Sequence, residues 1–257
     1  MSDPLLLSYK GILSLNFQSN NKIYGVYKMR NYMHLLFIGV SIASLLTGCA
    51  VNVSPVLNSS LSMDAFEKMG KIDVQDIKLA LYIDPKIKEL RIEQNVQSGK
   101  FSFNVGRAFS AKLIKALAYN FKTIHFIESP NYTGTDTIDA VMYVNLEDVD
   151  LNLSLKSGLT TVSAETYTRL SIRAEIKDFE EKKTIWVGTT QAKESATHQE
   201  LGPMYYQEAG RGYAMAIDST IDKAIGDLIS DMSKSQNLSV YIDKWEQKRK
   251  GVSHASQ

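Results

Sequence analysis

The sequence has one cysteine, and the residues before it point to a specific chemistry. Cys49 closes an apolar run over 35–46 that follows the basic residues Lys28 and Arg30. A basic stretch, about a dozen apolar residues and a small-residue pair are typical of a segment that directs export and is then removed. The run is shorter than the roughly 20 apolar residues that a membrane span needs. The pattern therefore predicts a signal peptide over 29–48, cut directly before the cysteine.

Leu46, Thr47, Gly48 and Cys49 resemble the lipobox of bacterial lipoproteins, in which small residues precede the cysteine that receives the lipid. A thiol is the nucleophile that accepts a diacylglyceryl group, and small neighbours let the modified chain enter the signal peptidase. The resemblance implies that Cys49 becomes the acylated N-terminus, with chains of the palmitate type. Two or more acyl chains anchor stably, because each buried methylene contributes about 0.8 kcal/mol. The alternative is a buried free cysteine at the end of an apolar helix.

The residues around this motif bear on location and on the start of the protein. Lipoproteins retained in an inner membrane commonly carry Asp after the cysteine, so by resemblance Ala50 implies an outer-membrane anchor with the domain facing the periplasm of a Gram-negative cell. Residues 1–28 are polar, lack a clear period and displace the signal from its usual place. We therefore expect Met29 to be the true start and 1–28 to be an extension ahead of it. The alternative is a cytoplasmic extension on an uncleaved signal anchor, which would leave the lipobox unused.

His198 and the pair Asp148 and Asp150 are the other residues that could do chemistry. His198 has two glutamates and a serine nearby in sequence, but no Gly-x-Ser-x-Gly turn accompanies it. The two aspartates suit calcium binding or acid–base work, and equally a solvated strand face. The histidines lack metal-ligand spacing, and the glycines form no phosphate-binding fingerprint. We predict no catalytic residue, no metal and no cofactor; a hydrolase that uses His198 or Asp148 is the alternative.

A segment over 196–213, predicted as a loop, carries the most suggestive surface residues. It contains Met204, Tyr205, Tyr206 and Arg211, whose types are enriched where proteins contact one another. We predict that these four residues bind an envelope protein partner or a second copy of the chain. The alternative is that the tyrosines fold back onto the edge of a sheet.

The composition suits one globular domain after the signal peptide. Hydrophobic residues make up 44% and charged residues 22% of the chain, so we expect a single core over 72–235. The part after residue 48 holds 25 of the 29 basic and 27 of the 28 acidic residues, a net charge of about −2. This balance gives no electrostatic reason to expect nucleic acid as a partner. A lone cysteine also excludes an internal disulfide.

Two flanking segments are expected to lie outside that core. Residues 49–71 are rich in Ser and Asn and predict a flexible, lipidated tether, with a short helix over 61–69 that Ser62 caps. Residues 236–257 predict a polar, basic C-terminal tail. Trp245, among lysines and an arginine, makes this tail a second candidate for surface contact, at a layer of anionic headgroups.

Hydrophobic periodicity predicts the elements that would position these residues. They are, in order, a strand over 77–83, a hairpin over 89–104 with Gly99 in its turn, a helix over 106–121, a strand over 123–127, long strands within 140–177, a return strand over 184–193 and a helix over 208–233. Along the first long strand the apolar residues occupy every second position, and this alternation shifts by one residue at Glu147 and Asp148, which predicts a β-bulge. The fold class is therefore α+β, an antiparallel or mixed sheet with two helices packed on one face.

This order of elements resembles accessory lipoproteins of outer-membrane assembly and export machines, such as the lipopolysaccharide-assembly and exopolysaccharide-export lipoproteins. The resemblance covers about residues 75–233 and depends on the helix over 105–121, the strands over 140–177 and the helix over 208–233. It implies a non-catalytic binding or accessory subunit of an envelope assembly, transport or secretion complex, and it carries no functional residue across. A carrier that holds a lipid or small ligand between sheet and helices is a further alternative.

Overall fold

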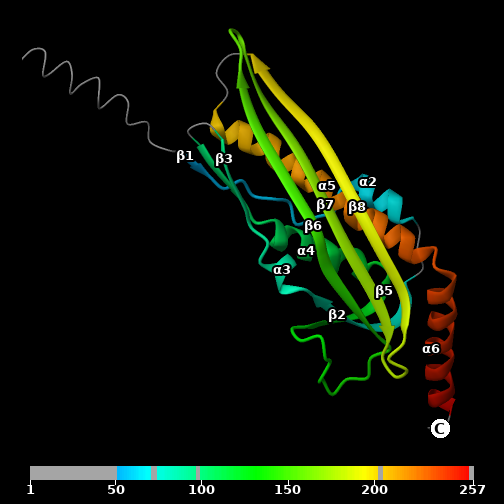
Figure 1. The fold of residues 1–257 in the computed structure, drawn as a ribbon. Helices are drawn as coiled ribbons and strands as arrows, with labels where there is room; N and C mark the ends of the chain where they lie inside the picture. The colour runs from blue at the N-terminus through cyan, green and yellow to red at the C-terminus, as the bar shows by residue number, and fades with distance from the viewer. Residues whose placement is uncertain (1–50, 71–73, 97–98, 202–204, 255–257) are drawn as a thin grey trace, which may run out of the picture. The chain divides into compact units, whose positions relative to one another are not determined.

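The computed structural model describes residues 51–70, 74–96, 99–201 and 205–254 (Figure 1). The chain divides into two compact units, Met1–Cys49 and Ala50–Gln257, and every described residue belongs to the second. The signal peptide, the lipobox with Cys49, Ala50 and Met204 lie outside the described residues, so their assignments stay predictions. The described unit is α+β, with two sheets and five helices, which confirms the predicted fold class.

The larger sheet has five strands in the order β5-β2-β6-β7-β8. They are β2 (Gln75–Ile83), β5 (Phe121–Ile127), β6 (Ala140–Ser157), β7 (Thr161–Asp178) and β8 (Thr184–Leu201). Strand β2 runs parallel to β5 and β6, whereas β6, β7 and β8 form an antiparallel meander, so the sheet is mixed. Strand β2 has buried residues on both of its faces, Leu79 and Ala80, because an inner parallel strand is covered on both sides.

The long strands confirm one prediction and correct another. The pairing of β6 with β7 shifts register between Leu146 and Asp148, which is the predicted bulge at Glu147. Strand β8, however, continues to Leu201, so the loop predicted to begin at 196 is wrong over its first six residues. Those residues are exposed and polar along much of their length, and no apolar alternation marks them as a strand. Their backbone pairs with β7 nonetheless.

A smaller sheet has three strands in the order β1-β4-β3. They are β1 (Val51–Val53), β4 (Gly99–Phe103) and β3 (Ile92–Val96), and the antiparallel pair β3 and β4 is the predicted hairpin. Gly99 does not serve a left-handed turn, since Gly70 is the glycine with positive φ among the described residues. A side chain at 99 would instead overlap the ring of Tyr206. The glycine is therefore needed for close packing.

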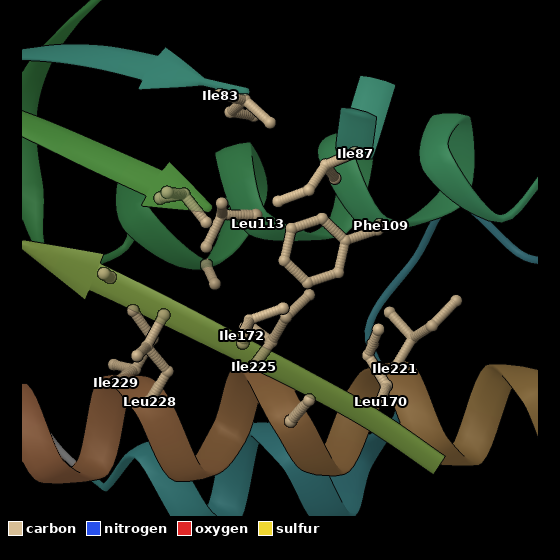
Figure 2. Packing of buried hydrophobic residues seen from close by; sticks show 14 of the residues in the cluster. Ile83, Ile87, Phe109, Leu113, Leu170, Ile172, Ile221, Ile225, Leu228 and Ile229 are labelled. Atoms are coloured by element: carbon tan, nitrogen blue, oxygen red, sulfur yellow. The ribbon is translucent and has the colours of Figure 1, made fainter. Parts of the chain in front are cut away.

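Two of the helices cover one face of the larger sheet, as predicted. The described helices are α2 (Met63–Met69), α3 (Pro85–Lys88), α4 (Val105–Ala118), α5 (Tyr206–Ser233) and α6 (Gln236–His254). Figure 2 shows Phe109 and Leu113 of α4 pointing toward Ile172 of β7 and Ile225 of α5, and all four are buried in one cluster. The two predicted helices are thus confirmed as α4 and α5, which supply the core with the sheet. The predicted end of the first at 121 is wrong, because α4 ends at Ala118 and Phe121 begins β5.

Helix α6 corrects the prediction of a polar tail. Leu238, Tyr241 and Trp245 recur at helical spacing and are buried. The indole Nε1 of Trp245 donates a hydrogen bond to Asp178 Oδ2 at 2.8 Å, and Lys244 pairs with Glu181. Bonds from Lys244 and from the Tyr241 hydroxyl lower the pKa of Glu181. The apolar stripe is narrow among many charges, and it is buried because β2, β8 and the turn between β7 and β8 lie against it.

Replacing Trp245 with alanine is expected to lower the free energy of unfolding by about 3–5 kcal/mol, because a large buried side chain and the partner of Asp178 are removed together. Urea denaturation of the purified protein measures this. The matched control is Lys248→Ala, which removes an exposed ion pair with Glu180 and is expected to cost less than about 1 kcal/mol. Equal costs for the two variants would contradict the assignment of α6 to the core.

Candidate functional site

Residues 51–69, called here the anchor segment, follow Cys49 and lie packed along α5. Strand β1 pairs with β4, and a side chain at Gly210 of α5 would meet Val53 and Pro55. Further along, helix α2 begins at the predicted cap, where Ser62 Oγ accepts a hydrogen bond from the Ala65 N–H. The predicted flexible tether is therefore wrong for this part of the chain. Apolar residues at irregular spacing give no period, yet Leu61, Ala65 and Met69 join the core cluster.

A charged cluster fixes this segment to the helices. Lys112 of α4 is fully buried, and its Nζ lies 2.8 Å from Asp218 Oδ1 and 2.9 Å from Asp222 Oδ1, both on α5. An unpaired ammonium would be very costly in this place, whereas two carboxylates compensate its charge. Asp218 and Asp222 are four residues apart on α5, so one helix face presents both of them to the lysine.

The two carboxylates also hold the backbone of the anchor segment. The Asn58 N–H donates to Asp218, at 3.1 Å from Oδ1 and 2.9 Å from Oδ2, and the Ser62 N–H donates to Asp222 Oδ2 at 3.1 Å. A charged acceptor makes such bonds stronger than neutral ones. The cluster therefore ties α4, α5 and the chain that leads to Cys49 into one rigid unit.

Lys112 is not among the residues singled out from the sequence, so this cluster was missed. On α4 the lysine stands next to Leu113 and one turn after Ala108, both of which are buried. The one available signal was the i, i+4 pair of aspartates beside the apolar stripe of α5. That pair does not reveal its partner, since the lysine is 106 residues away from Asp218 along the chain.

The structure separates the four residues predicted to bind a partner. Tyr205 is 70% exposed just before α5, and Arg211 is exposed on its second turn. Tyr206 instead lies against Phe101, with ring centroids 6.0 Å apart, as the alternative of a tyrosine folded back onto a sheet predicts. Met204 is outside the described residues. Tyr205 and Arg211 are thus the pair that the structure leaves open to a partner.

Aromatic packing supports this part of α5. Tyr213 is fully buried, meets Phe101 edge-on with centroids 5.0 Å apart, and donates a hydrogen bond from its hydroxyl to the Ser154 carbonyl at 3.0 Å. Burial raises the pKa of Tyr213 to about 12, because the phenolate would lose its hydration. The helix turn that bears Arg211 is therefore held firmly against β6 and β4.

Neither His198 nor the pair Asp148 and Asp150 lies in an arrangement of side chains that suits catalysis. His198 lies in β8, not in a loop, and its Nε2 is 3.1 Å from Glu200 Oε1. Ser195 is three positions away along the strand, so its side chain faces the other side of the sheet. Arg169 lies between the two aspartates of β6, with Nη2 2.8 Å from Asp148 and 3.9 Å from Asp150. Both pairs are thus part of a solvated, ion-paired sheet.

Two general properties complete the description of the site. Within the described ranges, no helix combines the length and the apolar character that crossing a bilayer requires. In the same part of the chain, the His, Cys, Asp and Glu side chains form no group of three or more that could hold a metal ion.

No family model and no curated protein matches this chain. Several solved structures match this chain at low identity and with TM-scores below 0.5. A Xanthomonas campestris protein of the DUF330 family is 10% identical, with a TM-score of 0.41, over 73% of this chain and 99% of that one. A neuraminyllactose-binding hemagglutinin homologue from Helicobacter pylori is 8% identical, with a TM-score of 0.40, over 75% and 100%. A minor lipoprotein from Acinetobacter baumannii is 12% identical, with a TM-score of 0.31, over 62% and 95%.

Proposed function

We propose that this chain is a lipid-anchored, non-catalytic binding or accessory subunit of an envelope assembly, transport or secretion complex. In this proposal acyl chains on Cys49 hold it in the outer membrane, and the domain faces the periplasm. The supporting observation is the docked anchor segment: two residues after Cys49 the chain enters a sheet, and Lys112, Asp218 and Asp222 then clamp it to two helices. Such an attachment suits a domain that works at a defined place beside the membrane.

Two observations favour a binding role over the alternatives. His198 is hydrogen-bonded to Glu200 and Asp148 is ion-paired with Arg169, both on exposed strands, which leaves the hydrolase without a positioned acid, base or nucleophile. The space between sheet and helices is filled by packed side chains such as Phe109 and Leu113 (Figure 2). A ligand carried in that interior would have to displace the core.

The exposed pair Tyr205 and Arg211 is the proposed contact with a partner. Tyrosine and arginine supply a large share of binding energy at protein interfaces. The pair lies at the start of α5, at the same end of the domain as the start of β1 (Figure 1). A partner at this place would itself lie beside the membrane, as an envelope membrane protein or a second copy of the chain would.

Replacing Tyr205 and Arg211 together with alanine is expected to weaken partner capture at least about 30-fold, because interface anchors of these types contribute about 2 kcal/mol or more. Mild crosslinking in intact envelopes, followed by purification through a tag, measures the captured partner. Val240→Ala on α6 is the matched control, since it changes an exposed residue far from this pair. Undiminished capture by the double variant would contradict the proposed contact, and a wild-type chain that captures nothing would contradict the accessory role.

A further inference from the structure

We infer that the turn between β6 and β7 contacts the lipid surface and inserts Leu159 into it, so that the domain meets the membrane at two points. The first point is the lipid on Cys49, and to that extent the inference rests on the proposed function. The second is a surface of the folded domain itself.

The start of β1 and the start of α5 lie together at one end of the domain (Figure 1). Val51 pairs with Gly99, and the ring of Tyr206 lies directly over Gly99. Strand β1 runs parallel to β4 and away from this end, and the anchor segment then follows α5 from Gly210 to Asp222. The described part of the chain therefore enters the domain here, at Val51.

The turn between β6 and β7 projects from the same end. Leu201, the last residue of β8, pairs with Thr161, the first residue of β7, and only three residues separate Leu201 from Tyr205. A side chain at Gly212, one turn and a half into α5, would meet His198 of β8. Strand β8 thus ends where α5 begins, and the turn that precedes Thr161 lies beyond both.

The reach of the turn matches that of the anchor. Leu159 stands two residues beyond Thr161, and Cys49 stands two residues beyond Val51. Leu159 lies in a turn that the Gly158 N–H closes by donating to the Thr161 carbonyl at 2.7 Å, so it stands just beyond the end of its strand. At about 3.3–3.6 Å per extended residue, Cys49 is at most about 7 Å from Val51 along the chain. A lipid surface that receives the acyl chains of Cys49 is therefore within reach of Leu159.

The chemistry of the turn suits a lipid surface. Residues 158–160 are Gly, Leu and Thr, without a charge, and the Leu159 side chain is fully exposed. The other turn of the same meander, over 179–183, contains four charged residues and lies at the far end with α6. A single exposed leucine is ordinary, but here it occupies the uncharged tip next to the anchor. Tyr205, exposed nearby, is of a type enriched at membrane–water interfaces.

The test uses the lipidated mature protein in vesicles of phosphatidylethanolamine and phosphatidylglycerol. Because acylation occupies the only native thiol, Leu159→Cys adds a single site for an environment-sensitive fluorophore. Lipids that carry a nitroxide near the headgroup then quench any label that enters the interface. Val240→Cys on α6 is the control, at an exposed position on a helix at the other end. Thr160→Cys gives a second position in the turn.

We expect the labels at 159 and 160 to lose about half or more of their emission, because an inserted side chain reaches about 5–10 Å into the headgroup boundary. The label at 240 should keep its emission. Unquenched turn labels on protein that floats with the vesicles would overturn the inference and leave the anchor intact. Equal quenching at 159 and 240 would also overturn it. Protein that does not float with the vesicles, and whose Cys49 thiol is free to react with a second fluorophore, would overturn the proposed function and the inference with it.

Discussion

Replacing Cys49 with serine is expected to release the protein from the membrane completely. A hydroxyl does not replace the thiolate as acceptor of the diacylglyceryl group, and every acyl chain that is lost removes about 0.8 kcal/mol per buried methylene. Metabolic labelling with a palmitate analogue measures acylation, and sedimentation of envelopes measures attachment. Wild-type protein should carry label and sediment with the envelopes, whereas Cys49→Ser should do neither.

The matched control for this prediction is Ala50→Asp, which leaves the cysteine in place. It should still take up the acyl label and stay with membranes, but by the lipobox resemblance it should fractionate with the inner membrane. Wild-type protein without acyl label, or a serine variant that sediments as before, would contradict lipid anchoring at this cysteine. The control also separates the anchor from the membrane to which the protein is sorted.

Replacing Lys112 with methionine is expected to lower the free energy of unfolding by about 3–5 kcal/mol. The variant keeps most of the side-chain volume but leaves Asp218 and Asp222 as uncompensated carboxylates, with side chains that are 19% and 11% exposed. Urea denaturation measures the loss. Hydrogen exchange should at the same time become faster at the Asn58 and Ser62 amides, because these donate to the same carboxylates.

Two companion variants show whether buried charge is the cause. Lys115→Met, also on α4, removes an exposed lysine that donates to the Ser59 carbonyl at 2.8 Å, and should cost less than about 1 kcal/mol. Adding Asp218→Asn and Asp222→Asn to Lys112→Met should recover much of the lost stability, since no charge is then left unpaired. If Lys112→Met costs no more than Lys115→Met, the cluster does not hold the anchor segment as described.

Elements whose pattern repeats over many residues could be predicted from the sequence. The apolar stripe of α5 predicted a helix over 208–233. The helix runs over 206–233, so the predicted bounds are correct to within two residues. The parity change at Glu147 located the bulge of β6. In both cases one face of a single element is buried over its length, so the local order of apolar residues records its environment.

Elements that depend on distant partners were mispredicted. The final residues of β8 and the helix α6 are largely polar, and each is ordered by contact with another element, β7 for the one and the turn around Asp178 for the other. The anchor segment was mistaken for a tether for the same reason. Its apolar residues have no period because they pack on α5 through an irregular path.

The sequence by itself carried the predictions of an export signal and of a lipobox ending at Cys49, because signals of this kind are short linear motifs in consecutive residues. It also determined the fold class, through hydrophobic periodicity within each element. Only the tertiary structure decided that the chain after Cys49 is clamped and that Lys112 is buried between two aspartates. It alone placed the turn between β6 and β7 at the same end of the domain as the start of β1. These features join residues that are far apart in the sequence, and a one-dimensional pattern does not record which of them meet.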